Sequence, residues 1–329
     1  MTTRDRARAA FRLARFVKPA GGGAGGHRSG WPWVVDRLRE RQSMNGMLVD
    51  QFVEATFAPG RSIRVIKRLL GMHVWSRPWV GVFHLPPNMP EWFTPKTLEA
   101  VLREPRFIRS LPHLRGAVAF SRHTGDWLRD RLGVPVLVTK HPTEMVPDTF
   151  SWDAFEANPD KRLVQIGWYL RNYRAINQVA APSWIRKVHL AQSKPFIDEA
   201  RRRTDLHSPF RGRPDVGETE VVSWLDNEAY DDMLTRNLIF LELFEASANN
   251  AIIEAIARDT PVVVNRHPAV AEYLGADYPL FYDDLSEVEG LLEAPRIRAA
   301  HEQIRALDKG EFAVEAFIDR LDLFVRDLR

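Results

Sequence analysis

The residues best placed to do chemistry in this sequence lie between an apolar run and an amphipathic run. Residues 238–244, LIFLELF, are apolar enough for a buried strand, and residues 249–259, NNAIIEAIARD, are typical of a helix that leads into a second strand. Polar side chains occupy the junction and the helix start: Glu245, Ser247, Asn249, Asn250 and Glu254. We therefore predict a ligand site where a strand ends and a helix begins.

These side chains suit a ligand that carries phosphate and ribose. The free backbone N–H groups and the positive end of a helix attract anions, and Ser and Asn can both cap the helix and donate to phosphate oxygens. The Glu254 carboxylate could accept hydrogen bonds from the two vicinal hydroxyls of a ribose. Capping of the helix, with Glu254 as a favourable charge near its start, is an equally good structural explanation. Glu245 is harder to explain in that way, because an acid that follows a core strand needs a partner.

The elements around this junction alternate between apolar strands and short amphipathic helices. Strands are expected at 79–85, 116–121, 134–140, 162–170, 187–193, 221–225, 238–244 and 260–265. The Pro- and Asp-rich stretch 141–161 breaks the alternation and separates two series, and 329 residues suit two domains. We predict an α/β fold of two doubly wound, Rossmann-like parallel sheets that bind ligands at the carboxyl ends of their strands.

Composition and charge exclude several classes of protein. The chain has no cysteine, which excludes disulfides and thiolate metal sites, and a net charge of +3 demands no nucleic-acid partner. No uncharged run approaches the roughly 18 residues of a membrane helix, and the histidines show no metal-binding spacing. We expect a cytoplasmic protein that needs no metal ion and no cofactor besides its substrate.

The N-terminal residues have two interpretations. Arginines interrupt every apolar stretch of residues 1–26, which excludes a signal peptide. The segment could form a basic amphipathic helix, with Phe11, Ala14 and Val17 on its apolar face, that contacts the inner membrane surface. Alternatively, it is a poorly ordered tail followed by a flexible Gly-rich linker.

At the junction described first, the sequence resembles a known family. EASANNAIIEAIARDTPVVVN is similar to the donor-binding motif of GT-B fold glycosyltransferases, in particular the retaining class with an E-x7-E signature. EAIARDTPVVV fits the second half of that motif, with Asp259 in place of the usual Gly. In the first half, Ser and Asn replace a Gly-rich turn, and Glu245 and Glu254 are nine positions apart rather than eight. The resemblance implies that Glu254 binds ribose and that Glu245 stands near the position of the first glutamate.

Two further segments extend the resemblance. RLVQIGWYLRNYRAI matches the family's strand, Gly and basic pair near the donor diphosphate, which implies this role for Arg171 and Arg174. Guanidinium groups suit a diphosphate leaving group, although two solvated arginines on a loop would look the same. VGVFHLPPN places His84 at a strand end near the transferred sugar, to orient it or, in an inverting enzyme, to act as a base; a satisfied core or loop histidine is the alternative. His141 would lie near the cleft between the domains, without an assigned role.

The resemblance also implies a domain layout. Residues 1–30 form a basic tail and linker, 31–150 an acceptor-side Rossmann-like domain, 151–310 a nucleotide-sugar-binding Rossmann-like domain, and 311–329 a helix that packs back toward the first domain. The two sheets would face each other across a cleft, as in the GT-B fold. No good strand precedes residues 27–38, so the first domain looks short.

The expected activity is glycosyl transfer from a nucleotide-diphosphate sugar, with UDP as the working nucleotide, to a glycan, lipid, small-molecule or protein acceptor. The resemblance implies retention of anomeric configuration, and we expect no metal requirement. The candidates for catalysis are His84, Arg171 and Glu245. The candidates for donor binding are Arg174, Ser247, Asn249, Asn250 and Glu254. A nucleotide-sugar epimerase and a non-catalytic GT-B-like binding or scaffold protein are the alternatives.

Overall fold

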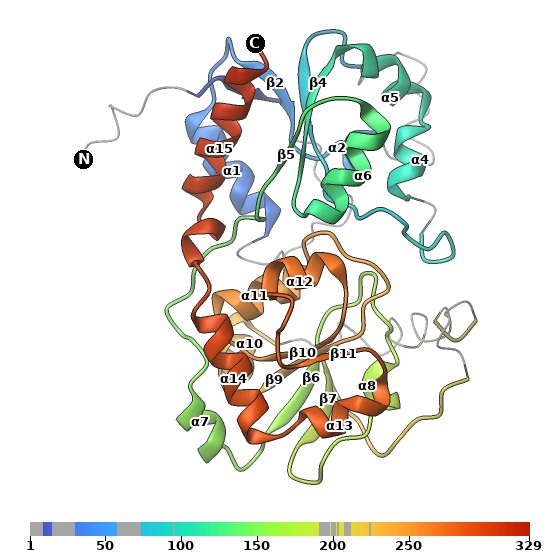
Figure 1. The fold of residues 1–329 in the computed structure, drawn as a ribbon, viewed down its shortest axis with the longest axis vertical. Coiled ribbons are helices and arrows are strands. Elements are labelled where there is room, and N and C mark those ends of the chain that lie inside the picture. The colour runs from blue at the N-terminus through green and yellow to red at the C-terminus, as the bar shows by residue number, and fades with distance from the viewer. Residues whose placement is uncertain are drawn as a thin grey trace. The chain divides into compact units, whose positions relative to one another are not determined.

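The structure of the chain, a computed structural model, divides into two compact units, each of which is described by itself (Figure 1). Unit 1 comprises Met1–Glu144 and Gly310–Arg329, and unit 2 comprises Met145–Lys309. The residues that the structure describes are 9–14, 30–57, 74–94, 96–190, 198, 202, 204–206, 212–223 and 225–329.

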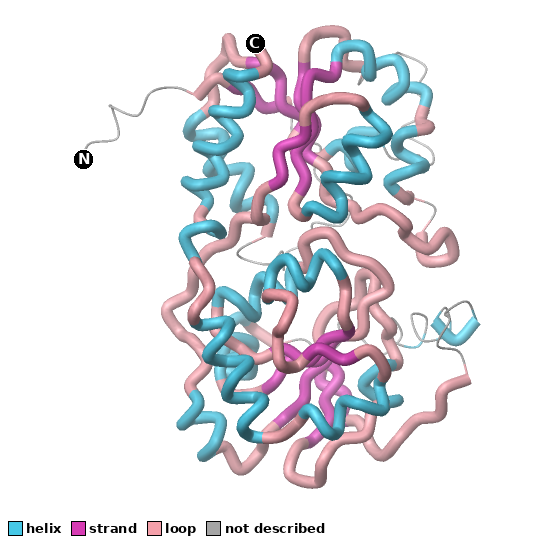
Figure 2. Tube along the Cα trace, viewed as in Figure 1, coloured by secondary structure: helices cyan, strands magenta, loops and turns pink. Residues whose placement is uncertain are grey.

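Unit 1 is built on a sheet of five parallel strands in the order β1-β2-β3-β4-β5. The strands are β1 (Phe11–Leu13), β2 (Met47–Asp50), β3 (Trp79–Val82), β4 (Leu114–Ala119) and β5 (Val136–Val138). The helices are α1 (Trp31–Arg41), α2 (Val53–Phe57), α4 (Leu98–Leu102), α5 (Pro105–Ser110), α6 (Arg122–Leu132) and α15 (Val314–Asp327). With the labels of Figure 1, Figure 2 shows the strands of this unit between α1 and α15 on one side and α4, α5 and α6 on the other.

One apolar core packs four of these helices against the sheet. Trp79 and Phe83 lie at its centre, and α2, α4, α5 and α6 contribute Val53, Phe57, Leu98, Val101, Phe107, Trp127 and Leu128. Burial of a large apolar side chain contributes roughly 1.5–3 kcal/mol, so this cluster fixes the carboxyl ends of β2 and β3.

The first strand corrects the prediction for residues 1–30. Phe11–Leu13 pair in parallel with Met47–Val49, so this segment is part of the sheet rather than a tail or linker. Phe11 and Ala14 are buried in unit 1, which is incompatible with the amphipathic helix predicted to carry them on a membrane-facing side. A three-residue edge strand needs only one deeply buried side chain, and the arginines beside it hid the apolar signal. The rest of the predicted tail, residues 1–8 and 15–29, lies outside the described part of the chain.

The last helix of the chain, α15, belongs to unit 1 and holds β1 in place. Asp322 of this helix accepts a hydrogen bond from the Ala10 backbone N–H, and Arg329 donates to the Ala10 carbonyl over 2.7 Å. The first and last described segments of the chain therefore stabilise each other.

Unit 2 is built on a sheet of six parallel strands in the order β11-β10-β9-β6-β7-β8. The strands are β6 (Arg162–Gln165), β7 (Arg186–Leu190), β8 (Glu220–Val222), β9 (Leu238–Leu241), β10 (Val262–Asn265) and β11 (Phe281–Tyr282). The helices are α7 (Trp152–Ala157), α8 (Ala175–Gln178), α10 (Asn227–Thr235), α11 (Asn250–Ala257), α12 (Pro268–Leu274), α13 (Val288–Leu291) and α14 (Ala294–Arg305). From β6 the chain runs outward to β7 and β8, and then returns to β9 on the opposite side of β6. The boundary between β6 and β9 is therefore the topological switch point, where open parallel sheets bind ligands.

Asp259, which replaces the glycine of the family motif, ends α11 in a left-handed conformation with φ 57°. Asp is one of the few non-glycine residues that adopt this conformation readily. Its carboxylate pairs with Lys309 over 2.5 Å, and its carbonyl accepts a hydrogen bond from His301 over 2.8 Å. These contacts compensate for the missing glycine.

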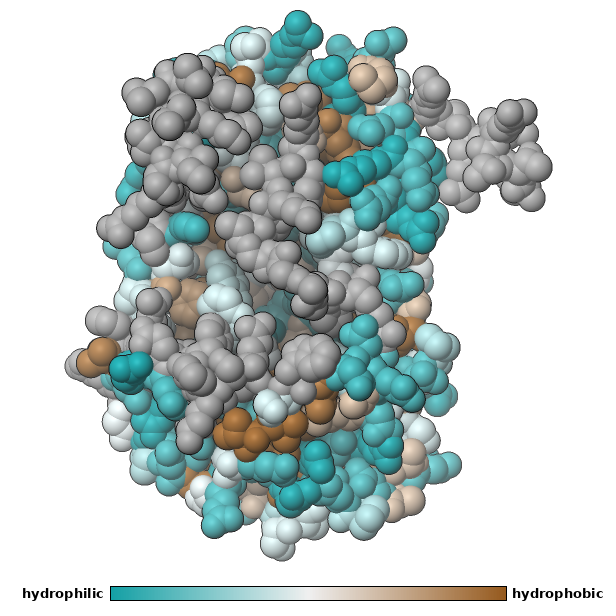
Figure 3. Space-filling view, turned by 180° about the vertical axis from the view of Figure 1, so that it is seen from behind, coloured by the Kyte–Doolittle hydropathy of each residue, from teal (hydrophilic) through white to brown (hydrophobic). Residues whose placement is uncertain are grey.

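Figure 3 shows one face of the molecule coloured by hydropathy. On the face seen in Figure 3, hydrophilic residues predominate among those drawn in colour, and hydrophobic residues gather in limited patches. Among the described residues, no helix is long and apolar enough to cross a membrane.

The buried position of Phe11 gives a test of β1. Phe11→Ala should lower the free energy of unfolding by about 3 kcal/mol, the usual effect of emptying a buried phenylalanine site. Arg12→Ala, at a partly exposed position in the same strand, is the control and should change it by less than about 0.5 kcal/mol. Urea unfolding followed by circular dichroism measures both. Equal stability of the two variants would show that residues 11–13 do not support the sheet in solution.

Candidate functional site

The loops that follow β6 and β9 join at the switch point of unit 2. The Asn172 N–H donates to the Glu242 carbonyl and the Phe244 N–H donates to the Leu170 carbonyl, each over 2.8 Å. Arg171 and Leu243 form an isolated antiparallel bridge between the same two loops. A ligand site at this edge therefore rests on a hydrogen-bonded platform rather than on two independent loops.

Arg171 lies at the centre of this platform. It is 7% exposed, and its guanidinium donates to the Ile166 carbonyl over 2.8 Å and to Asn249 Oδ1 over 2.9 Å. Gly167, at φ +67°, makes room for it, because an added Cβ would lie 1.5 Å from Arg171 Nη1. Burial lowers the pKa of Arg171 to about 10, against the favourable charge of Glu254, so it stays cationic at neutral pH. Its Nε has no hydrogen-bond partner among the described residues.

The start of α11 adds further groups that can bind an anion. Asn249 caps this helix, since its Oδ1 accepts from the Ala251 N–H over 3.0 Å as well as from Arg171. Ser247 is 4% exposed, and its hydroxyl has no hydrogen-bond partner within the described part of the chain. Asn250 is exposed in the first turn. A buried hydroxyl without a partner costs roughly 1–3 kcal/mol, which a ligand oxygen at this position would offset.

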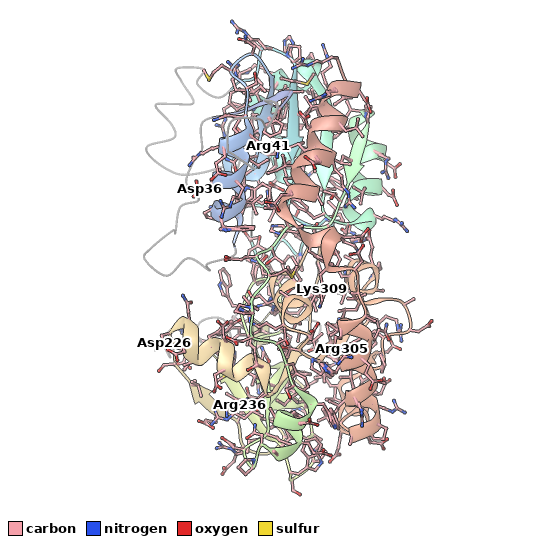
Figure 4. The ribbon with its side chains drawn as sticks, turned by 90° about the vertical axis from the view of Figure 1, so that its left-hand side faces the viewer. Asp36, Arg41, Asp226, Arg236, Arg305 and Lys309 are labelled. Carbon is pink, nitrogen blue, oxygen red and sulfur yellow. The ribbon has the colours of Figure 1, made fainter. Side chains whose placement is uncertain are left out.

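Glu254 is buried on the second turn of α11 and belongs to the same site. It accepts a hydrogen bond from the Tyr230 hydroxyl of α10 over 2.5 Å, and α10 also pairs with α11 through Asp231 and Arg258. Figure 4 labels Asp226 and Arg236 near the two ends of α10. Burial first, and the charge of Glu254 second, raise the pKa of Tyr230 well above its ordinary value. The negative charge of Glu254 also stabilises the Arg171 cation.

Glu245 has the partner that its position required. Its Oε1 accepts from the Ala246 N–H over 3.0 Å and from His267 Nε2 over 2.8 Å. His267 caps α12, where its Nδ1 accepts from the Ala269 N–H, so Nε2 carries the proton that it donates to Glu245. These contacts brace the loop after β9. The sequence signal for His267 is a histidine directly before Pro268 at a helix start.

Arg174 forms ion pairs with two carboxylates. Its guanidinium donates to Asp205 over 2.7 Å and to Asp215 over 2.6 Å, at the start of α8. Both carboxylates raise its pKa. These ion pairs give Arg174 a structural position, whereas Arg171 remains within reach of α11.

Two residues that the sequence analysis does not predict hold the loop after β9. Glu242 is buried and binds Asn172 Nδ2 and, over 2.9 Å, Arg213. Asn265, at the end of β10, accepts from the Leu243 N–H over 2.7 Å and donates to its carbonyl over 3.1 Å. Nothing in their spacing distinguishes such loop-bracing side chains from ordinary polar residues at strand ends.

In unit 1, His84 follows β3 and packs among aromatic rings. Its ring centroid lies 4.3 Å from that of Trp31 and 4.4 Å from that of Phe52. Burial first, and His141 second, lower the pKa of His84 to about 3, and burial lowers the pKa of His141 to about 4. Both imidazoles are therefore neutral at neutral pH, and His84 Nε2 donates to the Gln51 carbonyl over 3.1 Å. A group with so low a pKa is a poor general base.

Glu54 positions the backbone of His84, a role that the sequence analysis does not predict. Its Oε1 accepts from the N–H groups of His84 and Leu85, each over 2.7 Å. Its Oε2 is buried and has no hydrogen-bond partner in the described residues. Burial raises the pKa of Glu54 to about 7. An acid one turn after β2 carries no sequence signal for this role.

The raised pKa of Glu54 predicts a stability change with pH. Folding raises this pKa from 4.5 to about 7, so the folded state keeps a proton that the unfolded chain releases, and stability falls as the pH rises through that window. Glu54→Gln removes this loss, and the variant should therefore gain stability relative to the wild type, by a few kcal/mol, between about pH 4.5 and pH 7. Chemical unfolding at several pH values measures it.

Glu91→Gln, at an exposed turn of unit 1, is the matched control and should follow the wild type. The lowered pKa values of His84 and His141 act in the opposite direction, since their contribution is lost as the pH falls below 6.5, and they are common to all three proteins. Parallel stability profiles for Glu54→Gln and the wild type would contradict the burial of this carboxyl.

Solved structures provide relatives by fold, whereas no protein-family model and no curated protein sequence matches the chain. A sucrose-phosphate synthase from Thermosynechococcus elongatus matches with a TM-score of 0.58 and 14% identity, over 86% of this chain and 73% of that one. The Anabaena protein HepE, solved in complex with UDP and glucose, gives 0.56 and 11%, over 90% and 82%. A UDP-forming α,α-trehalose-phosphate synthase from Burkholderia xenovorans gives 0.53 and 13%, over 89% and 76%.

These structures are GT-B glycosyltransferases, and the likeness extends over both units of this chain. At identities of 11–14% it shows the fold. The parallel sheets of five and six strands agree with it. The predicted fold is therefore confirmed: this chain has the two-domain, Rossmann-like GT-B fold.

Proposed function

We propose that the protein is a glycosyltransferase that uses a nucleotide-diphosphate sugar, and that unit 2 binds this donor. The observation that carries the proposal is the group of residues at the β6–β9 switch point. The buried Arg171 cation is bonded to the cap of α11, and Glu254 follows within the helix. The Ser247 hydroxyl, which precedes that cap, has no hydrogen-bond partner among the residues that the structure describes.

The helix spaces a phosphate-binding part from a diol-binding part. Glu254 lies four positions after Asn250, which is about 6 Å along a helix axis. Glu254 accepts a hydrogen bond from Tyr230, and a carboxylate has lone pairs for about four, so it can also accept from a ribose diol. A nucleoside diphosphate presents its phosphates and its ribose hydroxyls in this order.

The same groups suit the departure of a diphosphate. Cleavage of the bond to the sugar moves negative charge onto the phosphate oxygens, and a preorganised cation in a buried place stabilises that charge. Arg171 supplies the cation and the start of α11 adds partial positive charge. Because these groups can hold the leaving group, we propose that transfer needs no metal ion. Retention of configuration is proposed on the E-x7-E resemblance alone.

The other predicted site residues take different parts in this proposal. Glu245 positions His267 and the loop after β9, and Asn250 offers the exposed first turn of α11. Arg174 is assigned no donor contact, because two carboxylates hold it. His84 is kept as a residue that orients a sugar rather than as a base. Contact with an anionic membrane surface is proposed only for the basic N-terminal residues outside the described part, and vesicle sedimentation tests it.

Ser247→Ala gives a clean test of the donor site. The Ser247 hydroxyl makes no hydrogen bond to the described part of the chain, so the free energy of unfolding should stay unchanged or rise slightly. The affinity for UDP should fall about five- to tenfold, the effect of one hydrogen bond worth roughly 1–1.4 kcal/mol. Isothermal titration calorimetry measures the affinity and thermal unfolding the stability. UDP is the first nucleotide to use, since HepE was solved with UDP and the trehalose-phosphate synthase is described as UDP-forming.

Arg236→Ala is the control for that experiment, because this exposed arginine at the end of α10 forms a local ion pair with Asp232. Glu254→Ala should weaken binding of both UDP and uridine. If neither Ser247→Ala nor Glu254→Ala alters the affinity for UDP, the nucleotide binds elsewhere and the site assignment is wrong.

The activity is tested by release of the nucleotide from a panel of nucleotide sugars, with EDTA and saccharide acceptors present. We expect sugar transfer to proceed in EDTA. Transfer that is absent in EDTA and returns only when a divalent ion is added would contradict the metal-independent proposal. An isomerised donor without any acceptor would indicate the epimerase. Absence of thermal stabilisation by every nucleotide sugar would favour the binding or scaffold protein.

A further inference from the structure

Two exposed aromatic residues stand on the turn that holds Arg171. Trp168 is 39% exposed and Tyr169 is 37% exposed, between Gly167 and the buried Arg171. Single exposed aromatic residues are common on protein surfaces. Two adjacent exposed aromatic residues shortly before Arg171, the central cation of the candidate site, need a more specific explanation.

The backbone is strained in a way that presents this pair. Gly167 and Leu170, which flank it, have φ +67° and +54°. A left-handed conformation is unfavourable for leucine, and strain of this kind clusters at functional sites. Leu170 and Arg171 point into the unit and are buried, while the two residues before them remain exposed. The Phe244 N–H and Gln165 Nε2 lock this arrangement, with hydrogen bonds to Leu170 O over 2.8 Å and Asn172 O over 3.0 Å.

The two rings form a corner. Their centroids are 5.5 Å apart and their planes meet at 86°. Perpendicular rings cannot enclose a flat base between parallel faces. A pyranose, in contrast, has C–H groups on its faces that pack against an aromatic ring, while its hydroxyls remain around the edge. The corner therefore fits a sugar ring better than a base.

From these observations we propose that Trp168 and Tyr169 are a subsite for a pyranose ring, next to the diphosphate bound by Arg171. This proposal rests on the proposed function, since it extends the donor site outward along the turn after β6. The sugar belongs either to the donor or to the acceptor, and the shared chemistry is an apolar sugar face against the aromatic corner. The pair thus determines specificity for a sugar rather than for the nucleotide.

The test compares the wild type with Trp168→Ala and Tyr169→Ala by titration calorimetry. UDP, UDP-glucose and UDP-galactose are each titrated into the free protein. Glucose and maltose are titrated into the protein saturated with UDP. Affinity for UDP should change less than twofold. The sugar-dependent part of binding should fall about tenfold in Trp168→Ala and should be largely restored in Trp168→Phe. Loss confined to the nucleotide sugars assigns the subsite to the donor, and loss confined to the added saccharides assigns it to the acceptor.

Trp184→Ala is the matched control, because Trp184 is 44% exposed in the same unit but precedes β7, at the amino end of the sheet. It should leave every affinity unchanged. Sugar-dependent binding equal to that of the wild type in both alanine variants, or a loss of affinity for UDP itself, overturns the subsite while leaving the donor site standing. A wild type that fails to bind UDP overturns the proposed function instead. The saccharides are then titrated alone, and no difference between the wild type and Trp168→Ala overturns the subsite as well.

Discussion

The hydrogen bonds of the Arg171 guanidinium are the interactions on which the candidate site depends. One reaches the Ile166 carbonyl just beyond β6, and the other reaches the Asn249 side chain that caps α11. A buried cation needs such partners, because transfer of a charge out of water is costly. Gly167 leaves space for the guanidinium, and Asn249 Oδ1 accepts hydrogen bonds from both Arg171 and the Ala251 N–H. One side chain thus joins the two strands that meet at the switch point.

The ends of the two sheets differ in charge. In unit 2, Arg171 and the start of α11 are positive and Glu254 balances them from within the helix. In unit 1, the lowered pKa values of His84 and His141 keep both imidazoles neutral, and the pKa of Glu54 lies at about 7. A charged ligand is therefore better matched to unit 2. In unit 1, the lowered pKa makes the His84 imidazole a poor proton acceptor at neutral pH.

The sequence was sufficient for the features that depend on local pattern. The alternating elements predicted two parallel sheets, and the polar residues between β9 and α11 predicted a capped helix start with Glu254 inside the helix. The residue that caps is Asn249, between the two candidates Ser247 and Asn250. These predictions succeed because a strand, a cap and a helix turn are set by residues a few positions apart. Asp259 shows how a departure from a motif can be tolerated, since Lys309 and His301 hold it in the conformation that the family's glycine adopts freely.

The sequence was insufficient where partners lie far apart along the chain. Arg174 and Arg171 look alike in the motif, yet Asp205 and Asp215 bind only the former. Glu54 reaches the backbone of His84 thirty residues later, and β1 consists of three residues whose only strong signal is Phe11. Tertiary packing determines which of these distant residues contact each other, and a local pattern of residue types does not reveal it.

The claim that the β6–β9 switch point binds the nucleotide is tested most directly by amide hydrogen exchange of the full chain with and without UDP. The account predicts slower exchange in residues 165–172 and 245–254, where the loop of Arg171 and the start of α11 lie. Residues 180–187, at the amino end of β7, should exchange at the same rate in both samples. Unchanged exchange in the first two segments at saturating UDP, or protection confined to other parts of the chain, would contradict the account.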